Sequence, residues 1–508
     1  MSEIYVLALS VVFSLIVVKL CHWVYQWSNP KCKGKLPPGS MGFPIIGETF
    51  EFMTPFDISL VVSPYLKKRI SRYGSKVFRT SLFGAKVIVS IDPDVNMEIA
   101  KASSQLRATE SVTRIFGENN PFLQSKEIHK YVRNLTSRFV GPEGLKTRLI
   151  HDIDNLLRND VENGARNGSF DVREATIKMV GELIAKKIMG ETESEAVKEL
   201  GLCWSAFRTS WFQFSYNIPG TTVYRLVKAR RKAAKLLKAL ILKKIVSKEG
   251  LGDFLDIIFD EMEKDGAALD IDKAVNLIFV FFILSQETTP GVQGAVVKLV
   301  ADHPSVMEEL QREHEAIVQN RADKDTGVTW EEYKSMTFTH MVIKESLRFT
   351  STQPTVHRIL DQDVQIGDYT LPAGWLFFGI PQVHFDEEKY DDPLTFNPWR
   401  WQGKDIHSTV SREYMPFGAG GTHCVGSEFA KIIKTCMVSF ENYFERLPVK
   451  LPNNRHVEKE KKKEVKEEEV ENWGLRELID GGDAAPGRIL HRNNINIGSS
   501  RFVSYNSF

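Results

Sequence analysis

The chain has 508 residues, of which 42% are hydrophobic and 26% are charged, with 66 basic against 65 acidic residues. This length allows a large buried core, and the formal net charge of +1 argues against nucleic-acid binding, which needs a basic excess. The ordinary apolar content and the low net charge exclude a disordered chain. Five scattered cysteines form no disulfide framework and indicate a reducing compartment.

The N-terminal segment 1–28 predicts a membrane anchor. Ile4–Val18 is a run of 15 uncharged, mostly apolar residues, whereas a bilayer span needs about 20. A snorkelling Lys19 and the interfacial aromatics Trp23, Tyr25 and Trp27 extend the run to that length. A cleaved signal peptide is the alternative, but it would need a basic start and a small-residue cleavage site.

Residues 29–49 predict a hinge between the anchor and the body. Its lysines at 31, 33 and 35 place the downstream chain in the cytosol by the positive-inside rule. Leu36–Gly47 contains three prolines and three glycines, which exclude a helix. This segment is either a plain linker or a rigid spacer that orients the body on the membrane.

Residues 50–450 predict one large domain that is mainly α with small β-sheets. Val77–Leu82 and Lys86–Ile91 form a hairpin pattern, and helical periodicity then dominates for about 250 residues. Val223–Val246 and Pro304–Gln319 are amphipathic helices, and strand-like character returns between residues 356 and 401. The fold class is therefore α+β.

The 24 residues between Lys273 and Lys298 contain one charge, Glu287. A second membrane span is disfavoured because Gln286–Pro290 would place a carboxylate, two hydroxyls and a proline at mid-depth. We expect instead a helix through the protein core that kinks or opens at Pro290. Glu287 is either a functional acid or an ordinary buried and hydrogen-bonded glutamate.

A glycine-rich loop, Pro416–Gly426, carries Cys424. The stretch Ser427–Phe444 predicts a helix directly after it, and the positive end of a helix dipole lowers the pKa of a nearby thiol. A cysteine-protease site would need an oriented histidine within hydrogen-bond reach of the thiol. His423 is adjacent in sequence, but the side chains of neighbouring residues usually diverge, which disfavours this function. One thiolate in a glycine-rich loop suits haem iron.

The pattern Phe417-x-x-Gly420-x-x-x-Cys424-x-Gly426 resembles the haem-binding signature of the cytochrome P450 monooxygenases. The helix Lys344–Arg348 and the segment Phe396–Trp401 resemble two further family motifs. Glu345 and Arg348 are three apart on one helix face, and Arg400 would share the carboxylate as a structural ion-pair triad. The resemblance covers the chain from the anchor to about residue 447.

The resemblance also implies a haem pocket and an oxygen-activating helix. Glu287 and Thr288 occupy the positions of the family's acid–alcohol pair, whose implied role is proton delivery. His129 and Arg133 match a tryptophan–arginine pair, with His replacing Trp, and Arg358 occupies another propionate-binding position. The implied cofactor is haem b (iron protoporphyrin IX), with Cys424 as the axial ligand of the iron.

By the same resemblance, the protein is a monooxygenase of the endoplasmic reticulum membrane, single-pass and with its catalytic domain in the cytosol. Its partners would be membrane lipid, an apolar small-molecule substrate and an NADPH-cytochrome reductase, with no nucleic acid, and we expect a monomer. Leu36–Thr49 is similar to the plant branch that oxidises brassinosteroids, triterpenoids and related terpenoids. Lys126, Lys130 and Arg138 are candidates for the reductase-docking patch, or else a solvated helix face.

Three departures from the family pattern stand out. Leu284 and Ser285 replace smaller residues, and Thr422 stands where a basic residue is common. Residues 451–508 predict a charged, poorly ordered tail in place of a strand-rich ending, since 12 of the 14 residues of Glu458–Glu471 are Lys or Glu. We expect that a divergent reading frame or altered splicing produced this tail.

Two other functions remain open at this point. The chain could be a haem-binding or membrane-scaffold protein that has lost catalysis through its altered C-terminus. It could also be an isomerase or dehydratase of peroxides, which needs no reductase, although the retained Glu287–Thr288 pair argues against that function.

Overall fold

The computed structural model describes most of the chain up to the end of the last helix. The described residues are 2–52, 54, 63–102, 110–117, 120–121, 126–166, 171–189, 195–207, 218–247, 253–264, 266–323, 326–350, 356–408 and 410–444. The predicted tail, 451–508, and the last six residues of the predicted domain lie outside this part of the chain.

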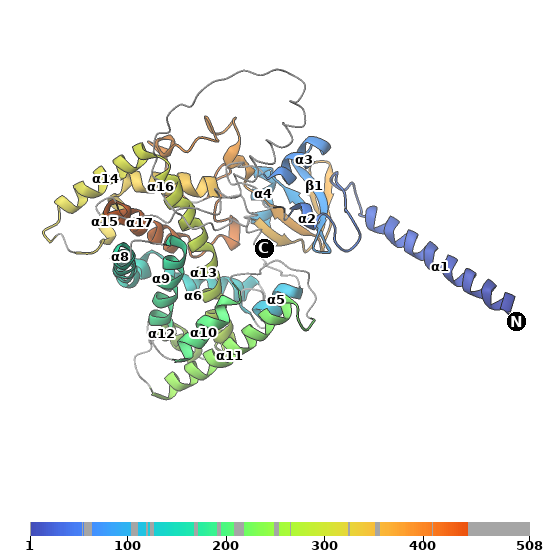
Figure 1. The fold of residues 1–508 in the computed structure, drawn as a ribbon, viewed down its shortest axis with the longest axis horizontal. Helices are drawn as coiled ribbons and strands as arrows, with labels where there is room; N and C mark the ends of the chain where they lie inside the picture. Colours follow the sequence, from blue (N-terminus) through green and yellow to red (C-terminus); the bar gives the residue numbers. More distant parts are fainter. Residues whose placement is uncertain are drawn as a thin grey trace, which may run out of the picture.

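Helices dominate the body, and the strands lie together between the anchor helix and the helical part (Figure 1). The fold is therefore mainly α with small sheets, as the sequence predicts. The helices are α1 (Ser2–Ser28), α2 (Thr49–Phe52), α3 (Pro64–Tyr73), α4 (Pro93–Ala102), α5 (Glu110–Phe116), α6 (Lys126–Val140), α7 (Pro142–Gly144), α8 (Ile150–Arg166), α9 (Val172–Ile184), α10 (Glu195–Ser205), α11 (Thr222–Ser247), α12 (Asp253–Met262), α13 (Ile271–Ala301), α14 (Pro304–Gln319), α15 (Trp330–Ser335), α16 (Thr337–Thr350) and α17 (Ser427–Phe444).

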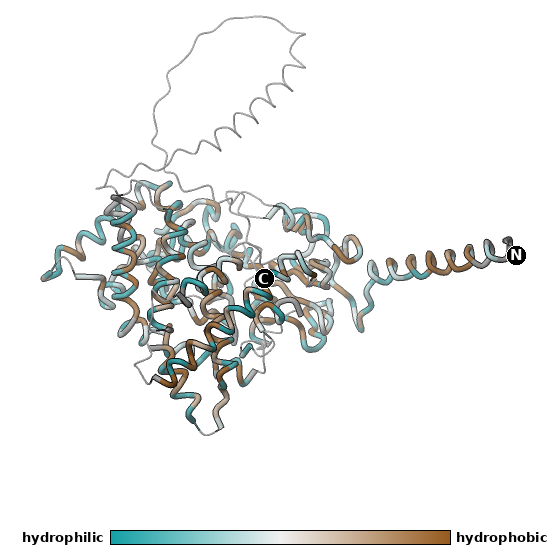
Figure 2. Tube along the Cα trace, turned by 60° about the horizontal axis from the view of Figure 1, so that its bottom comes forward, coloured by the Kyte–Doolittle hydropathy of each residue, from teal (hydrophilic) through white to brown (hydrophobic). Residues whose placement is uncertain are grey.

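The helix α1 projects away from the body and is apolar along most of its length (Figure 2). The stretch Leu9–Ser28 is long and apolar enough to cross a membrane, and none of it is buried against the rest of the protein. This arrangement is compatible with the predicted membrane anchor.

The connector after α1 is bonded to the body. Arg79 donates from its amide to the oxygen of Pro38 at 2.8 Å and from its guanidinium to the oxygen of Pro37, also at 2.8 Å. Gly39 has a φ of +152°, and a Cβ there would lie 2.0 Å from the backbone oxygen of Arg79. Because side chain and backbone both hold this segment, the rigid-spacer interpretation describes it better than a plain linker.

The larger sheet has four strands in the order β1-β2-β6-β3. The strands β1 (Val77–Leu82) and β2 (Ala85–Ser90) form the predicted hairpin, although β2 lies one residue earlier than the predicted Lys86–Ile91. The strand β6 (Leu376–Gly379) pairs in parallel with β2, and β3 (Val356–Ile359) pairs antiparallel with β6. A separate two-stranded sheet joins β4 (Val364–Ile366) to β5 (Tyr369–Leu371).

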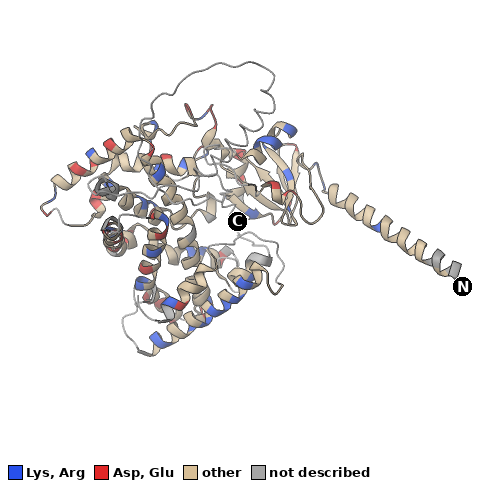
Figure 3. Ribbon diagram, in the orientation of Figure 1, with Lys and Arg blue, Asp and Glu red and all other residues tan. Residues whose placement is uncertain are grey.

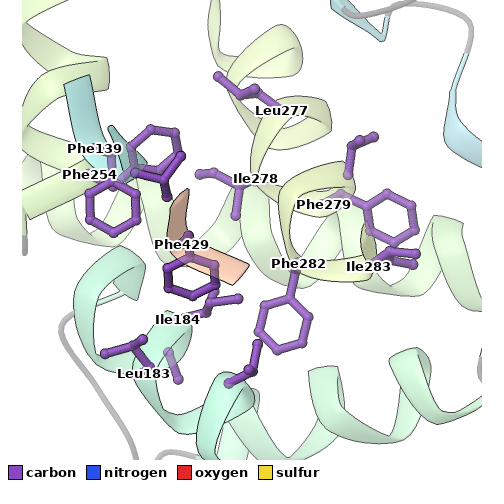
Figure 4. Packing of buried hydrophobic residues seen from close by; sticks show 14 of the residues in the cluster. Phe139, Leu183, Ile184, Phe254, Leu277, Ile278, Phe279, Phe282, Ile283 and Phe429 are labelled. Atoms are coloured by element: carbon purple, nitrogen blue, oxygen red, sulfur yellow. The ribbon is translucent and has the colours of Figure 1, made fainter. Parts of the chain in front are cut away.

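The helix α13 runs through the helical core. Figure 4 shows its side chains, among them Phe279 and Phe282, packed among residues of other helices such as Phe139 and Phe254. The helix Ile271–Ala301 is also long and apolar enough to cross a membrane, but more than half of its apolar stretch is buried inside the protein. The core-helix prediction therefore describes it better. The helix continues through Pro290 without ending, and the predicted kink or opening at this residue stays a prediction.

Candidate functional site

Cys424 lies at the end of a closed glycine-rich loop. Its amide donates to the backbone oxygen of Phe417 at 3.0 Å, which ties the two ends of the loop together. Gly420 has a φ of +69°, and a Cβ there would lie 2.0 Å from the backbone oxygen of Ala100 in α4, so this close approach requires glycine. The helix α17 begins three residues after the cysteine, at the predicted Ser427.

The thiol of Cys424 reaches the accessible surface but is closely surrounded by protein atoms. Burial raises the pKa of this thiol, so the predicted lowering by the helix dipole is not the net effect. The Gly426 amide and the charges of Arg133 and Lys434 oppose the rise, because each favours the thiolate. The described residues contain no group of three or more His, Cys, Asp or Glu side chains that could hold a metal ion.

Three of the predicted haem-binding side chains meet near this loop. His129 and Arg133 are one turn apart on α6, and Arg358 comes from β3. Arg133 donates a hydrogen bond to the backbone oxygen of His423. Burial lowers the pKa of His129, and the charges of Arg133 and Arg358 lower it further. The structure thus gathers these side chains and Cys424 into one electrostatic site.

The chemistry of this set fits a dianionic, iron-containing ligand. Burial lowers the pKa of Arg358 to about 10 and also lowers that of Arg133, because both cations are desolvated. Arg133 forms no ion pair with a carboxylate in the described part of the chain. An anionic ligand would therefore offset the free-energy cost of removing its charge from water. A sulfur ligand for the iron and two guanidinium groups for the propionates would fit haem.

The predicted triad is a hydrogen-bonded network around one fully buried carboxylate. Glu345 accepts from Arg348 at 2.8 and 3.0 Å and from Arg400 at 2.9 Å. The indole of Trp401 and the amide of Asn397 also donate to it, at 2.9 and 3.1 Å. Five donors therefore satisfy a carboxylate that has no access to water.

His384 was not predicted as a site residue, and it joins this network to the loop. Arg348 donates to the backbone oxygen of His384, and the His384 Nε2 accepts from the amide of Met415 at 3.1 Å. Burial and the charge of Arg348 lower the pKa of this histidine to about 3, so the ring is neutral. The sequence carried no signal for this contact, because a histidine in an apolar stretch is commonplace.

The predicted acid–alcohol pair lies in the middle of α13. The side chain of Thr288 is exposed, and its hydroxyl donates to the backbone oxygen of Leu284 at 2.9 Å. Ser285 likewise donates to the oxygen of Phe282 at 2.9 Å. The side chains of Glu287 and Thr422 lie outside the described ones, so the pairing of Glu287 with Thr288 stays a prediction.

The three basic residues proposed for partner docking differ in their surroundings. Lys130 is exposed, whereas Arg138 forms an ion pair with Glu261 of α12 at 2.7 Å. The side chain of Lys126 is outside the described set. Lysine and arginine are also dense along α11 (Figure 3), so basic residues are not confined to α6.

Comparison with known proteins identifies relatives over most of the length. The family model described as "Cytochrome P450" matches residues 37–466, so the match ends inside the predicted tail. "Cytochrome P450 708A2" of Arabidopsis thaliana is 39% identical over 427 residues, which cover 83% of this chain and 89% of that protein. "Cucurbitadienol 11-hydroxylase" of Siraitia grosvenorii is 33% identical, with 82% and 89% covered.

A sterol-oxidising relative and a solved structure extend the comparison. "Cholesterol 22-monohydroxylase CYP90B52" of Paris polyphylla is 30% identical and covers 82% of this chain and 89% of its own. Among solved structures, "Retinoic acid bound cyanobacterial CYP120A1" matches with a TM-score of 0.69 at 23% identity, covering 81% of this chain and 92% of that one. At that identity the structural match supports the fold alone.

Proposed function

This chain belongs to the cytochrome P450 family and is a monooxygenase, and on that premise we propose that it hydroxylates a triterpenoid or sterol at the membrane of the endoplasmic reticulum. The observation that carries the proposal is that the half-buried Arg133 acts electrostatically on Cys424 and, together with the buried Arg358, on His129. Family members bind haem through a cysteine thiolate, and the relatives named above include hydroxylases of a triterpenoid and of a sterol.

In this proposal each site residue has a defined role. Cys424 ligates the haem iron, and the loop Phe417–Gly426 lets the backbone lie close to the flat cofactor. Arg133 and Arg358 bind the propionates, and neutral His129 lies beside them. When bound, the haem supplies the redox chemistry that activates molecular oxygen.

The helix α13 would provide the protons for the reaction. Glu287 and Thr288 follow one another on α13, and the threonine hydroxyl already donates to the Leu284 oxygen. Its own oxygen can therefore accept a hydrogen bond from water while the neighbouring carboxyl supplies protons. The triad around Glu345 would have a structural role, since Glu345 and Arg348 are fully buried.

The membrane and the electron donor complete the proposal. The exposed helix α1 would anchor the chain by a single pass, with the docked connector fixing the body beside the lipid surface. Electrons would come from an NADPH-cytochrome reductase, which could use the exposed side of α6 that includes Lys130. An apolar substrate dissolved in the membrane would then reach a body already held at its surface.

Turnover by the full-length protein tests this function. The protein in microsomes, supplied with NADPH-cytochrome reductase, would be incubated with a panel of triterpenoids and sterols, and products would be identified by mass spectrometry. We expect an NADPH-dependent product one oxygen heavier than a panel member, and none without the reductase. A normal thiolate spectrum with no product from any panel member would contradict the proposal and would favour a haem-binding protein without catalysis.

A further inference from the structure

A short segment, from the connector into α2, exposes three large apolar side chains. Phe43 is 78% exposed, Phe50 is 67% exposed and Ile45 is 49% exposed. Outside α1, no other phenylalanine among the described side chains is exposed. Met41 and Thr49 are buried, so the segment packs on the body while it presents these three side chains to the outside. Apolar side chains gathered in this way indicate a contact surface.

Backbone hydrogen bonds hold the segment in place. The Gly47 amide donates to the Phe43 oxygen at 2.6 Å, and the Glu48 amide donates to the oxygen of Ser81 in β1 at 2.8 Å. The exposed side chains are therefore carried by a segment that is bonded to the β1–β2 hairpin. A contact made through them would fix the orientation of the sheet.

Ile45 has a strained backbone. Its φ is +70°, in the left-handed region, which is a genuine outlier for a β-branched residue. Glycine would adopt this conformation without the steric cost, but it would leave no side chain on the surface. Because the fold maintains strain to project an apolar side chain outward, we infer a function for that side chain.

The segment lies beside the end of α1. The indole of Trp27 donates to the Met41 oxygen at 3.3 Å, and Trp27 packs against the core cluster that contains Met41. Phe43 follows Met41 by two residues, which span at most about 7 Å. The helix α2, which carries Phe50, lies at the end of the body from which α1 projects (Figure 1). Tryptophans such as Trp27 are typical of the lipid–water interface, so a bilayer crossed by α1 would end close to these side chains.

The charges around the segment suit a lipid surface. Glu51 pairs with Lys68 at 2.7 Å and with Arg69 at 2.6 Å, and Glu48 pairs with Arg69 at 2.9 Å. Both carboxylates of the segment are thus compensated, whereas the connector lysines at 31, 33 and 35 are exposed. Exposed lysines favour anionic lipid headgroups. A second copy of this chain would bring the same positive charges opposite one another, so lipid is the better partner.

We propose that Phe43, Ile45 and Phe50 insert into the headgroup region of the bilayer that α1 crosses, as a second membrane contact of this protein. The proposal rests on the proposed role of α1 as the anchor. One helix alone would leave the body free to tilt on the membrane. A second contact, on a segment bonded to the sheet, sets which face of the body lies on the lipid.

Photolabelling of the full-length protein from within the bilayer tests the proposal. The protein would be reconstituted in vesicles of phosphatidylcholine and phosphatidylserine that contain a phospholipid with a diazirine on its acyl chain. After illumination, mass spectrometry would locate the labelled peptides. We expect label on α1 and on the segment 43–50, the latter several-fold above the peptide that contains Leu394, an exposed apolar residue elsewhere on the body.

A variant and its control sharpen the comparison. Phe43→Ser combined with Phe50→Ser should lower the labelling of the residues between them several-fold and leave that of α1 unchanged. Both side chains are exposed, so thermal unfolding of this variant should match that of the unaltered protein. Leu394→Ser is the matched control and should change neither signal.

Two outcomes would overturn the proposal in distinguishable ways. If α1 is labelled but the segment 43–50 carries no more label than the Leu394 peptide, the anchor stands and the second contact is wrong. If α1 itself is unlabelled, the proposed anchor fails, and the second contact fails with it.

Discussion

Arg348 donates a hydrogen bond to the backbone oxygen of His384, whose ring accepts one from the amide of Met415. The first contact belongs to the buried network around Glu345, and the second belongs to the segment that leads into the cysteine loop. One histidine thus links the two most recognisable motifs of the sequence. Its position makes the stability of the loop depend on a residue that no motif includes.

We expect His384→Leu to destabilise the protein by about 1–3 kcal/mol, because the buried Met415 amide would lose its acceptor. His384→Gln can still offer an oxygen to that amide and should cost less. Thermal unfolding and the ratio of haem to protein absorbance measure the two effects. The role of His384 would be disproved if the leucine variant were as stable and as rich in haem as the glutamine variant.

Arg348→Leu removes the cation that binds Glu345 with two hydrogen bonds inside the core. We expect a loss of about 3–5 kcal/mol, because the carboxylate would stay buried with fewer donors. Arg312→Leu is the matched control, since Arg312 pairs with Glu309 on an exposed helix surface, where such a pair is worth about 0–1 kcal/mol. Denaturant unfolding measures the free energy of unfolding of both variants. Equal losses of stability in the two would contradict a special role for the buried network.

We expect the carboxyl of Glu51 to contribute to the pH dependence of the protein's stability. Hydrogen bonds from Arg69 and Lys68 lower its pKa from 4.5 to about 2. A carboxyl whose pKa is lowered by folding stabilises the protein above its unfolded pKa, here 4.5, and this contribution is lost as the pH falls toward 2. The side chain is 40% exposed, so solvent screening keeps the effect small.

We therefore expect Glu51→Gln to be less stable than the unaltered protein at pH 6, with the difference shrinking between about pH 4.5 and pH 2. Thermal midpoints measured at several pH values would show this convergence. Glu331→Gln, whose carboxylate is 75% exposed and lies 3.9 Å from Lys334, should show little of it. A constant difference at all pH values would mean that Glu51 keeps its ordinary pKa.

Local patterns predicted much of the fold. The hairpin at 77–90 and the helices Pro304–Gln319 and Ser427–Phe444 depend on residue spacing and on turn residues, which are visible in the sequence. The contact of Glu345 with Arg348 follows from their three-residue separation on a helix, and the addition of Arg400 followed from the family resemblance.

The unpredicted features all depend on contacts between distant segments. Met415 and His384 are 31 residues apart in the sequence, and only the folding of the chain brings them into contact. No spacing rule predicts that contact. The net pKa of Cys424 follows from burial, which the helix-dipole argument left out. Lys434 is indistinguishable from a surface lysine until the packing of α17 shows that it is buried.

Cys424→Ser should abolish the thiolate spectrum, because a serine hydroxyl does not supply the sulfur ligand. The measurement is the carbon-monoxide difference spectrum of the reduced protein. Cys32→Ser provides the control, since Cys32 lies in the connector and contacts Gly34 rather than the loop. An unchanged Soret band in Cys424→Ser would refute the ligand assignment.

Thr288→Ala should separate oxygen consumption from product formation. The Thr288 hydroxyl donates to the Leu284 oxygen, so its own oxygen is available to accept from a water that carries protons inward. Without it, we expect product formation to fall by about 100-fold, the size of a general acid–base contribution, while NADPH consumption continues and hydrogen peroxide is released. Thr288→Ser keeps the hydroxyl and should retain most of the coupling. Peroxide and product are measured against NADPH in the same reaction. Full coupling in the alanine variant would mean that protons reach the site by a route that does not include Thr288.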